Sequence, residues 1–262
     1  MSLDLSIIIV NWNTAVPLKN CLTSITDAAE IIVVDNASAD DSVAMVAHDF
    51  PRVRLIRNSE NAGFARANNQ GWRASAHEFV LFLNSDTRVP PDALRQLVEF
   101  MRAHSDAGAC SPRLARADHS TQPFAFGGDP TPAYLLRRGF ARLILHRTLH
   151  DWETREPQAV DWVSGACLLA RRDALEQVSG WDEKFFMYFE DSDLCLRLRR
   201  AGWKIFYNPR VTITHLGGAS LAQNRTRTQF YDASLHYFYT KHFSLLARAL
   251  LELLLPFYRR IA

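Results

Sequence analysis

Acidic residues follow two of the apolar stretches in the first hundred residues of the chain. Asp35 comes directly after Ile31–Val34, and Asp86 follows Phe79–Leu83 after two further polar residues. A carboxylate in such a position can accept hydrogen bonds from a nucleobase or a ribose, or bind a hard cation together with substrate phosphates. Each residue is also compatible with a turn or a helix cap, where aspartate is favoured. Both are therefore candidate ligand-binding residues whose role the spacing leaves open.

Three ionisable residues in the second half are candidates for catalysis or metal binding. Glu190 and Asp191 stand at the start of an expected helix, 191–201, and His215 follows the strand-like segment 211–214. A general base has to reach the proton that it removes within hydrogen-bond distance, and a carboxylate at a helix start can do so. From the sequence pattern alone, a helix cap is the favoured role of Asp191. A lone histidine such as His215 is more often structural than a ligand.

Four apolar runs in the first half must position these residues. They are continuous rather than alternating, as in strands that are buried on both faces. The runs are 5–10, 31–34, 53–56 and 79–83, with helical patterns between them at 16–26, 41–49 and 64–76. This order predicts an α/β fold with a mainly parallel sheet and helices on both faces. Ligands bind such sheets beyond the carboxyl ends of the strands, where three polar clusters are expected: Asn11-Trp12-Asn13, Asp35-Asn36 and Asn84-Ser85-Asp86.

The rest of the chain has a weaker pattern. A helix is expected at 92–104, strands at 166–170 and 204–207, and a helical tail from Thr226 onward. The stretch 111–132 is rich in proline, glycine and polar residues and is predicted to be a long surface loop. Its Phe124 and Phe126 are of a type that can stack on a sugar.

Composition and motifs exclude several classes of protein. The 262 residues include 30 basic and 28 acidic residues, which does not favour nucleic acid as a partner. No GxGxxG motif follows the first strand and no GxxxxGK(S/T) motif occurs, so nothing indicates a nicotinamide dehydrogenase or a P-loop NTPase. The four cysteines are far apart, which indicates buried thiols rather than zinc ligands or disulfides.

The two ends of the chain bear on its location. The N-terminal residues lack the basic and apolar regions of a signal peptide, and no apolar run of about 18 residues occurs. A cytoplasmic protein is therefore expected. The leucine-rich tail is too apolar for a solvated helix and is expected to pack on the core, form a homodimer, or lie on a membrane surface. In the last case Arg259 and Arg260 would face lipid phosphates at the inner face of the cell membrane.

Seven sequence blocks occur in an order typical of one family. They are SIIIVNWN (6–13), IVVDNAS (32–38), NAGFARANNQG (61–71), LFLNSD (81–86), SGAC (164–167), GWDEKFFMYFEDSD (180–193) and the segment 202–215. The ordered set resembles the GT-A glycosyltransferases of family 2, and most of all bacterial rhamnosyltransferases. Each block alone is a weak motif, but together they cover residues 5–220 approximately.

The resemblance implies a nucleoside-diphosphate sugar as donor. Asp35 is implied to contact the base, with Asn36 and the loop Asn11–Asn13, including Trp12, beside it. Arg66 is a candidate for binding the diphosphate of the donor, although an exposed arginine is usually no more than a solvated side chain.

The resemblance also implies Mg²⁺ or Mn²⁺ as cofactor. Asp86 matches the last residue of the family's DxD motif and is implied to bind the metal, with His215 as a second ligand. Asn84 occupies the place of the first aspartate, and Ser85 lies between them. Asn84 keeps an oxygen ligand but removes a charge, which predicts weaker metal binding in the absence of a diphosphate.

The resemblance further implies an inverting transfer. Asp191 matches the base that deprotonates the acceptor hydroxyl, with Glu190 or Asp193 as the alternative carboxylate. Trp181 and Asp182 are candidates for the acceptor site, although Trp181 is as compatible with the core.

The function expected from the resemblance is sugar transfer in bacterial surface polysaccharide synthesis, with dTDP-rhamnose as donor and a glycan or lipid-linked glycan as acceptor. A UDP-hexose donor and a non-catalytic nucleotide-sugar-binding protein or scaffold on the same fold are the alternatives. The expected organisation is a catalytic domain over 1–222, with a donor half (1–110) and an acceptor half (111–222), followed by a helical segment over 223–262.

Overall fold

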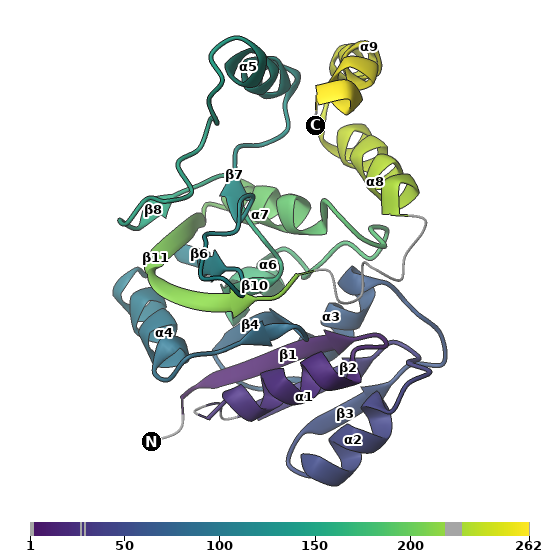
Figure 1. The fold of residues 1–262 in the computed structure, drawn as a ribbon, viewed down its shortest axis with the longest axis vertical. Coiled ribbons are helices and arrows are strands. Elements are labelled where there is room, and N and C mark those ends of the chain that lie inside the picture. Colours follow the sequence, from purple (N-terminus) through teal and green to yellow (C-terminus); the bar gives the residue numbers. More distant parts are fainter. Residues whose placement is uncertain (1–2, 27, 29, 218–226, 262) are drawn as a thin grey trace.

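The computed structural model describes residues 3–26, 28, 30–217 and 227–261, and the side chains of 227 and 256–261 are outside this description. Its centre is a mixed sheet with helices on both faces (Figure 1). In spatial order the main strands are β3 (Arg54–Arg57), β2 (Glu30–Asp35), β1 (Leu5–Asn11), β4 (Phe79–Asn84), β10 (Cys167–Arg171), β6 (Ala107–Ala115), β11 (Lys204–His215) and β5 (Thr87–Arg88), and β8 (Gln158–Ala159) pairs with β11. The predicted α/β fold is confirmed.

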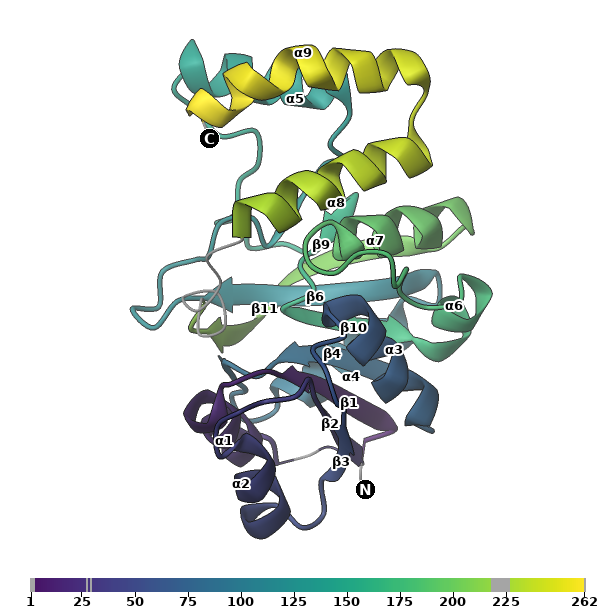
Figure 2. The same cartoon turned by 90° about the vertical axis from the view of Figure 1, so that its right-hand side faces the viewer.

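The first four long strands run parallel, as their continuous apolar pattern predicts. In the register Asn11 pairs with Asp35, and Val10 pairs with Asn84, so the polar strand ends meet at one edge. The helices α1 (Ala15–Ser24) and α2 (Ser42–Asp49) cover one face, and α3 (Phe64–Ala74) covers the other with α6 (Arg172–Gln177) (Figure 2). Each expected element of this half is present within two residues of its expected bounds.

The second half adds strands of mixed direction. β10 is antiparallel to both β4 and β6, whereas β11 runs parallel to β6. The prediction of a surface loop over 111–132 is wrong for its first five residues, which belong to β6. These five residues pair with β11, whereas β10 pairs with β6 only at Ala109 and Cys110. A break in the pairing register of β11 after Asn208 lies opposite Pro112 and Arg113. Proline is tolerated in sheets at such irregular places.

The second half also contributes three longer helices before the tail. They are α4 (Ala93–Ala103), α7 (Glu190–Arg200) and α5 (Pro132–Leu143), and a short ribbon pairs β7 (Phe126–Gly127) with β9 (Trp162–Val163). The sequence pattern did not predict α5. A start signal is nonetheless present, because Thr131 accepts a hydrogen bond from the Tyr134 N–H and Pro132 occupies the first turn.

The tail forms two helices, α8 (Arg227–His242) and α9 (Leu245–Ile261), as expected from its leucines. α9 lies beside α5 at the end of the molecule farthest from α2 (Figures 1 and 2). A second apolar cluster joins α7, α8 and α9 through buried side chains, which are Phe185, Leu196, Leu235, Phe238, Tyr239, Leu251 and Leu255. No helix in the described part of the chain has the length and apolar composition that a membrane span requires.

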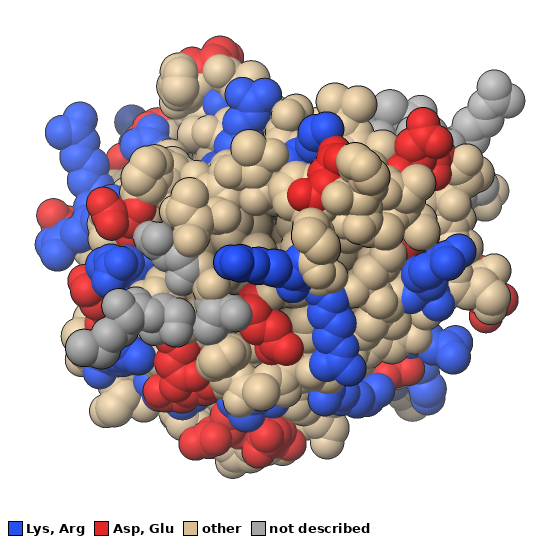
Figure 3. Space-filling view, turned by 90° about the horizontal axis from the view of Figure 1, so that it is seen from below, with Lys and Arg blue, Asp and Glu red and all other residues tan. Residues whose placement is uncertain are grey.

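One apolar core extends from Leu3 to Ile213 and includes all four cysteines, which are free thiols as predicted. The expected boundary at 110/111 falls within β6, and the one at 222/223 lies outside the described residues. The face opposite α5 and α9 carries lysine, arginine, aspartate and glutamate side chains that are interspersed rather than segregated by sign (Figure 3).

Candidate active site

The carboxyl ends of β1 and β2 form a hydrogen-bonded polar edge. The Asn11 side-chain amide donates to Asp35 Oδ2 at 2.9 Å and to the Ser38 hydroxyl at 3.0 Å. Asp35 Oδ1 accepts from the Ser38 backbone N–H at 2.9 Å, and Asp35 is 2 % exposed. The Thr14 hydroxyl bridges Asn11 Oδ1 and Ser85. These bonds fix the Asp35 carboxylate before any ligand binds.

Two turns hold this edge in place. Asn13 and Ala37 have φ of 54° and 61°, which is uncommon for residues other than glycine. Asn13 Oδ1 accepts from the Ala39 N–H at 2.7 Å, so the two turns are tied together. Asn36 is buried beside them, donating to the Gly63 carbonyl, and Trp12 is half-buried. The first two predicted polar clusters are therefore neighbours.

Asp86 and His215 come together at the end of β4. Asp86 Oδ1 is 3.2 Å from His215 Nε2, and both residues are buried. His215 Nδ1 is 2.8 Å from Gln122 Oε1, and Nε2 is 3.2 Å from the Asn84 amide nitrogen. Because Gln122 Oε1 can only accept, His215 Nδ1 is the donor of this hydrogen bond, and Nε2 is the ring nitrogen that faces Asp86.

A carboxylate oxygen and an imidazole nitrogen at this distance fit two ligands of one cation. Two ligands that lie about 2.1 Å from a metal at a right angle are about 3 Å apart. No third histidine, cysteine, aspartate or glutamate joins Asp86 and His215 among the described residues. Substrate phosphates and water would complete the coordination of Mg²⁺ or Mn²⁺ in such a site.

Gln122 is a site residue that the sequence pattern did not reveal. It orients His215 from the segment between β6 and β7, 93 residues away in the sequence. An outer hydrogen bond of this kind fixes the tautomer and orientation of a ligating histidine. Nothing in the local sequence around Gln122 indicates the contact.

Glu190 and Asp191 are the first two residues of α7, and their carboxyl groups are poorly solvated. Asp191 Oδ2 accepts from the Gly165 N–H at 3.1 Å and Oδ1 from the Ser192 N–H at 2.7 Å. Burial raises the pKa of Asp191 above its ordinary value, although these hydrogen bonds oppose the rise. Burial and the neighbouring Asp191 charge raise the pKa of Glu190 further, and Glu190 Oε2 has no hydrogen-bond partner among the described residues.

The turn before α7 is strained. Tyr188 and Phe189 have φ of 72° and 62°, which aromatic side chains rarely adopt. Two such residues in succession cost about 1–3 kcal/mol each, and backbone strain of this kind concentrates at ligand-binding sites. The turn directs Asp191 toward a pocket rather than into the core.

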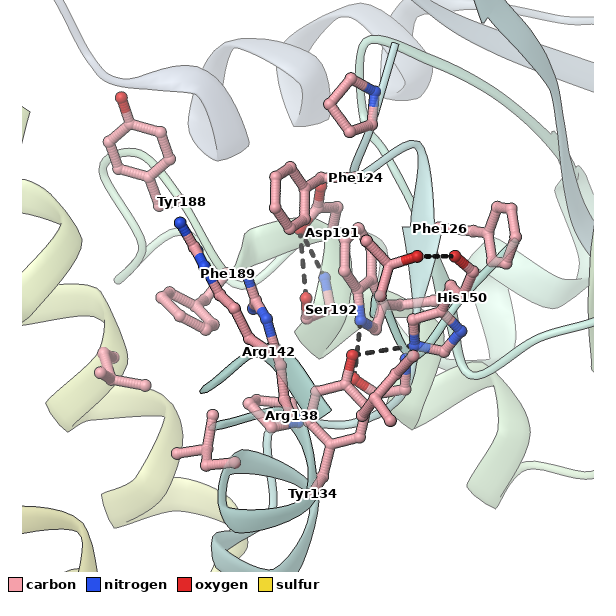
Figure 4. Close-up of a pocket in the computed structure, with 18 of the residues that line it drawn as sticks. Phe124, Phe126, Tyr134, Arg138, Arg142, His150, Tyr188, Phe189, Asp191 and Ser192 are labelled. Carbon is pink, nitrogen blue, oxygen red and sulfur yellow. Dashed lines mark hydrogen bonds between the residues drawn. The ribbon is translucent and has the colours of Figure 1, made fainter. Parts of the chain in front are cut away.

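This pocket has a volume of about 990 Å³ and lies between α7, α5, α8 and α9. Figure 4 shows Asp191 and Ser192 on one side and the arginines of α5 on the other. Aromatic residues form much of the lining, which includes Phe124, Phe126, Tyr134, His150, Trp152, Trp162, Tyr188 and Phe189. Gln122 also lines it, so the pocket extends from Asp191 to the residue that orients His215.

Of the predicted site residues, Glu190 and Asp191 line this pocket, and three others belong neither to its lining nor to the hydrogen bonds described above for the strand ends. Trp181 is 2 % exposed and packs edge-on against Phe64 and Phe82, behind Gly165. Asp182 accepts hydrogen bonds from Tyr237 and Lys241 of α8. Arg66 is exposed in the first turn of α3. Trp181 and Asp182 therefore hold the core and the tail helices together.

The sequence comparisons define the family. The model of Glycosyl transferase family 2 matches residues 6–152. The N-acetylglucosaminyl-diphospho-decaprenol L-rhamnosyltransferase of Mycobacterium tuberculosis is 30 % identical in an alignment of length 236 that covers 80 % of this chain and 75 % of that protein. Rhamnosyltransferase WbbL of Escherichia coli K12 is 27 % identical over 58 % of this chain and 60 % of its own length. The chain belongs to glycosyl transferase family 2 and is a glycosyltransferase.

Solved structures confirm the GT-A-like fold. GalNAc-T7 with UDP, GalNAc and Mn²⁺ superposes with a TM-score of 0.63 at 16 % identity, over 80 % of this chain and 42 % of the GalNAc-T7 chain. The mannosyltransferase PcManGT of Pyrobaculum calidifontis, in complex with GDP-Man and Mn²⁺, superposes with a TM-score of 0.58 at 19 % identity, over 99 % of this chain and 83 % of its own. The chain thus spans less than half of the GalNAc-T7 chain.

Proposed function

We propose that this glycosyltransferase transfers a sugar from a nucleoside diphosphate to an acceptor hydroxyl with inversion at the anomeric carbon. One observation carries the proposal: a single pocket extends from Asp191, a carboxylate with a raised pKa, to Gln122, which orients the His215–Asp86 pair. A candidate base thus lies on the same cavity as a side chain that contacts the candidate metal site. In this reading the donor half and the acceptor half are functional halves of one folded core.

The donor would lie along the polar strand ends. Asp35 would accept hydrogen bonds from the base, in a position that Asn11 and Ser38 already fix. Trp12, Asn13 and Asn36 would line the same place, with Asn84 and Ser85 beside the diphosphate. Arg66 is exposed near this edge and would approach the phosphates.

Asp86 and His215 would hold a divalent cation, Mg²⁺ or Mn²⁺. When bound, such an ion would neutralise the charge that develops on the departing diphosphate. Asn84 donates toward His215 Nε2 in the present arrangement and would turn its amide to offer an oxygen.

Asp191 would act as the base. Its carboxylate would take the proton of the acceptor hydroxyl while the hydroxyl oxygen forms a bond to the anomeric carbon. The bond from that carbon to the diphosphate oxygen breaks, and its electron pair leaves with the diphosphate. Attack opposite the leaving group inverts the configuration. Glu190, whose pKa is raised more strongly, would ionise less readily than Asp191 beside it.

The proposed donor is dTDP-rhamnose, since two relatives are named rhamnosyltransferases. A UDP-hexose is the second candidate, because a protein of Haloferax volcanii named as a low-salt glycan biosynthesis hexosyltransferase is 31 % identical over 75 % of this chain. The proposed acceptor is a sugar on a lipid carrier in surface polysaccharide synthesis. The Asp86–His215 pair and Asp191 argue against a scaffold without activity.

The end formed by α5 and α9 would contact an anionic membrane surface. Leu136, Phe140, Ile144 and Leu246 are among its exposed apolar side chains. Residues 131–150 include four arginines and no acidic residue, a composition that complements anionic lipid. Flotation with phosphatidylglycerol vesicles should carry the protein upward, and phosphatidylcholine vesicles should not. If the protein is a dimer and floats with neither kind of vesicle, this end is a subunit interface instead.

Calorimetric titration of dTDP, UDP and GDP tests the donor site. We expect binding of dTDP or UDP that is stronger with Mn²⁺ and falls at least tenfold in Asp86→Ala, because the carboxylate is the charged ligand of the pair. Asp118→Ala, which removes an exposed carboxylate from the β6–β7 segment, is the matched control and should bind normally. If the folded protein binds none of the three nucleotides, the donor-site proposal is wrong.

A further inference from the structure

Thr14 precedes the first residue of α1, but its hydroxyl does not cap that helix, whose residues 15–24 all belong to the described part of the chain. A threonine in this position ordinarily accepts a hydrogen bond from the second or third N–H of the helix. The third helical residue is Pro17, which has no N–H to donate. The first N–H, that of Ala15, donates to Asp40 Oδ2 at 2.9 Å. Helix capping therefore does not account for the Thr14 hydroxyl.

The hydroxyl lies instead between the two parts of the proposed donor site. Thr14 Oγ1 donates to Asn11 Oδ1 at 2.6 Å, and Ser85 Oγ is 2.8 Å from Thr14 Oγ1. A hydroxyl has one proton, and that of Thr14 is used on Asn11, so the Ser85 hydroxyl is the donor of the second bond. The Asn11 amide in turn donates to Asp35 Oδ2. The four side chains form a hydrogen-bond chain with one direction, which begins at Ser85 and ends on the Asp35 carboxylate.

The chain begins in the turn that carries the proposed metal ligand. Ser85 and Asp86 are the two residues between β4 and β5. The Thr87 hydroxyl closes this turn by donating to the Asn84 carbonyl at 2.9 Å. Because the turn is so short and closed, a displacement of Ser85 also moves Asp86. Thr14 thus connects the position of the Asp86 carboxylate to that of Asp35, which is proposed to bind the base.

The chain is shielded from solvent. Asn11, Thr14 and Ser85 are 0 %, 3 % and 7 % exposed. In such surroundings the loss of one hydrogen bond leaves both of its partners unpaired, which costs more than the bond itself contributes. The chain therefore favours a single arrangement, in which Asp35 and the Asp86 turn keep a fixed spacing. A nucleoside diphosphate likewise holds its base and its phosphates at a spacing that the ribose sets.

We propose that Thr14 is a positioning residue through which nucleotide binding at Asp35 and metal binding at Asp86 strengthen each other. The proposal rests on the proposed function and states how the two ends of that donor site are kept in register. Thr14 acts through the groups at both ends rather than on the donor itself. Without its hydroxyl, a nucleotide held at Asp35 presents its diphosphate less accurately to the metal, and the metal adds less to the affinity.

Calorimetry of dTDP and UDP with and without Mn²⁺ measures this coupling as the ratio of the two affinities. Thr14→Val keeps the shape of the side chain without the hydroxyl and should lower the ratio about fivefold or more. Thr14→Ser keeps the hydroxyl and should restore most of the ratio. Thr23→Val removes an exposed hydroxyl that bonds to the Lys19 carbonyl on the same helix, and this matched control should leave the ratio unchanged. Coupling is reciprocal, so the gain in Mn²⁺ affinity on adding nucleotide should change by the same factor.

Ser85→Ala provides a second cut in the chain, which serves if Thr14→Val does not fold. It removes the donor at the metal end and leaves the bond from Thr14 to Asn11 in place. We expect a similar fall in the ratio. If both variants fold, the double variant should be no worse than the more affected single variant, because both remove the same bond. Tm values measured in parallel identify the folded variants.

The outcomes separate this proposal from the proposed function. An unchanged ratio in folded Thr14→Val, or equal losses of affinity with and without Mn²⁺, would overturn the positioning role, since the hydroxyl would then support the base site alone. Equal ratios in Thr14→Val and Thr14→Ser would overturn it as well. In each of these cases Mn²⁺-dependent nucleotide binding by the wild type leaves the proposed function standing. A folded wild type that binds no nucleotide would remove both.

Discussion

The donor edge and the pocket beside α7 are built in opposite ways. At the donor edge, short polar side chains bond to one another at the ends of adjacent strands, as Asn11, Asp35 and Ser38 do. The pocket is lined mainly by long apolar, aromatic and basic side chains from helices and connecting segments, and its central carboxylates have raised pKa values. The first region is assembled by β-sheet register, and the second by the packing of α5, α8 and α9 on α7.

The difference has a chemical consequence. A nucleotide presents many hydrogen-bonding groups at fixed spacing, so a rigid edge of small polar groups suits it. A base must stay poised between protonated and ionised forms, and a partly buried carboxylate with few partners achieves this. The two regions meet at Gln122, which lines the pocket and bonds to His215.

Asp191→Asn should have the largest effect and should affect the pocket but not the donor edge. We expect turnover to fall about 10²- to 10⁴-fold, the usual contribution of a general base, with nucleotide affinity within twofold of the wild type. In the wild type, turnover should rise with pH through the raised pKa of Asp191, and the variant should lack this rise. Transfer assays over a pH series and calorimetry measure both. Asp173→Asn, an exposed carboxylate in the first turn of α6, is the control. Normal turnover in Asp191→Asn would show that another group is the base.

Asp193, two residues along α7, should show the contrasting behaviour of a structural carboxylate. Burial raises its pKa, but the hydrogen bonds from His242 and Lys241 and the charge of Arg197 outweigh burial and lower it. Lys241 Nζ is 2.6 Å and His242 Nε2 is 2.7 Å from Asp193 Oδ1, which ties α8 to α7. Asp193→Asn should lower the free energy of unfolding by about 3 kcal/mol at neutral pH, because it removes the buried negative charge that pairs with Arg197 and Lys241.

The sign of its pH dependence follows from the lowered pKa. The stabilisation by Asp193 is present above the unfolded-state pKa of about 4 and is lost as the pH falls through the lower folded-state pKa. The Tm difference between wild type and variant should therefore shrink below pH 4 approximately. Asp106→Asn removes an exposed ion pair with Lys204 and should change Tm little at any pH. A difference that is constant with pH would contradict the ionic role of Asp193.

The smallest expected effect concerns Gln122, where the donor edge and the pocket meet. Gln122→Ala removes the acceptor for His215 Nδ1–H, and loss of such an outer partner lowers metal affinity about 10- to 100-fold. Mn²⁺ titration in the presence of dTDP or UDP measures the change, with Gln96→Ala of the exposed face of α4 as control. Nucleotide binding without metal should be unaffected. An unchanged Mn²⁺ affinity would contradict the proposal that His215, oriented by Gln122, is a metal ligand.

The donor edge was predictable because its signal is local. Apolar runs that are continuous over five or six residues identify buried parallel strands, and the polar residues that follow them must share an edge. Asn11, Asp35 and Asp86 were found in this way, and β1 to β4 have nearly the predicted bounds. The roles of Asp191 and His215 came from the family resemblance, since a helix-start aspartate and a lone histidine are ambiguous by themselves.

The pocket was not predictable, because no local pattern encodes it. Residues 111–115 have the composition of a loop but form a strand, since β11 supplies backbone partners for them about 95 residues further along the chain. Helix α5 breaks the helical pattern with Pro132 and Gly139 yet is held against α9. Gln122 is held by His215, which is 93 residues away in the sequence, and Arg138 stacks on Phe124 of the segment before α5.

The sequence by itself determined the α/β core, the edge at which polar side chains gather and the family of the chain. Those properties depend on periodicity and on neighbours along the strand, which the amino-acid order contains directly. Only the tertiary structure decided that Trp181 is a core residue, that Gln122 orients His215, and that Asp191 shares a pocket with the arginines of α5. Each of these depends on which distant segments pack together, and long-range packing overrides local preference because burial outweighs the small differences in propensity.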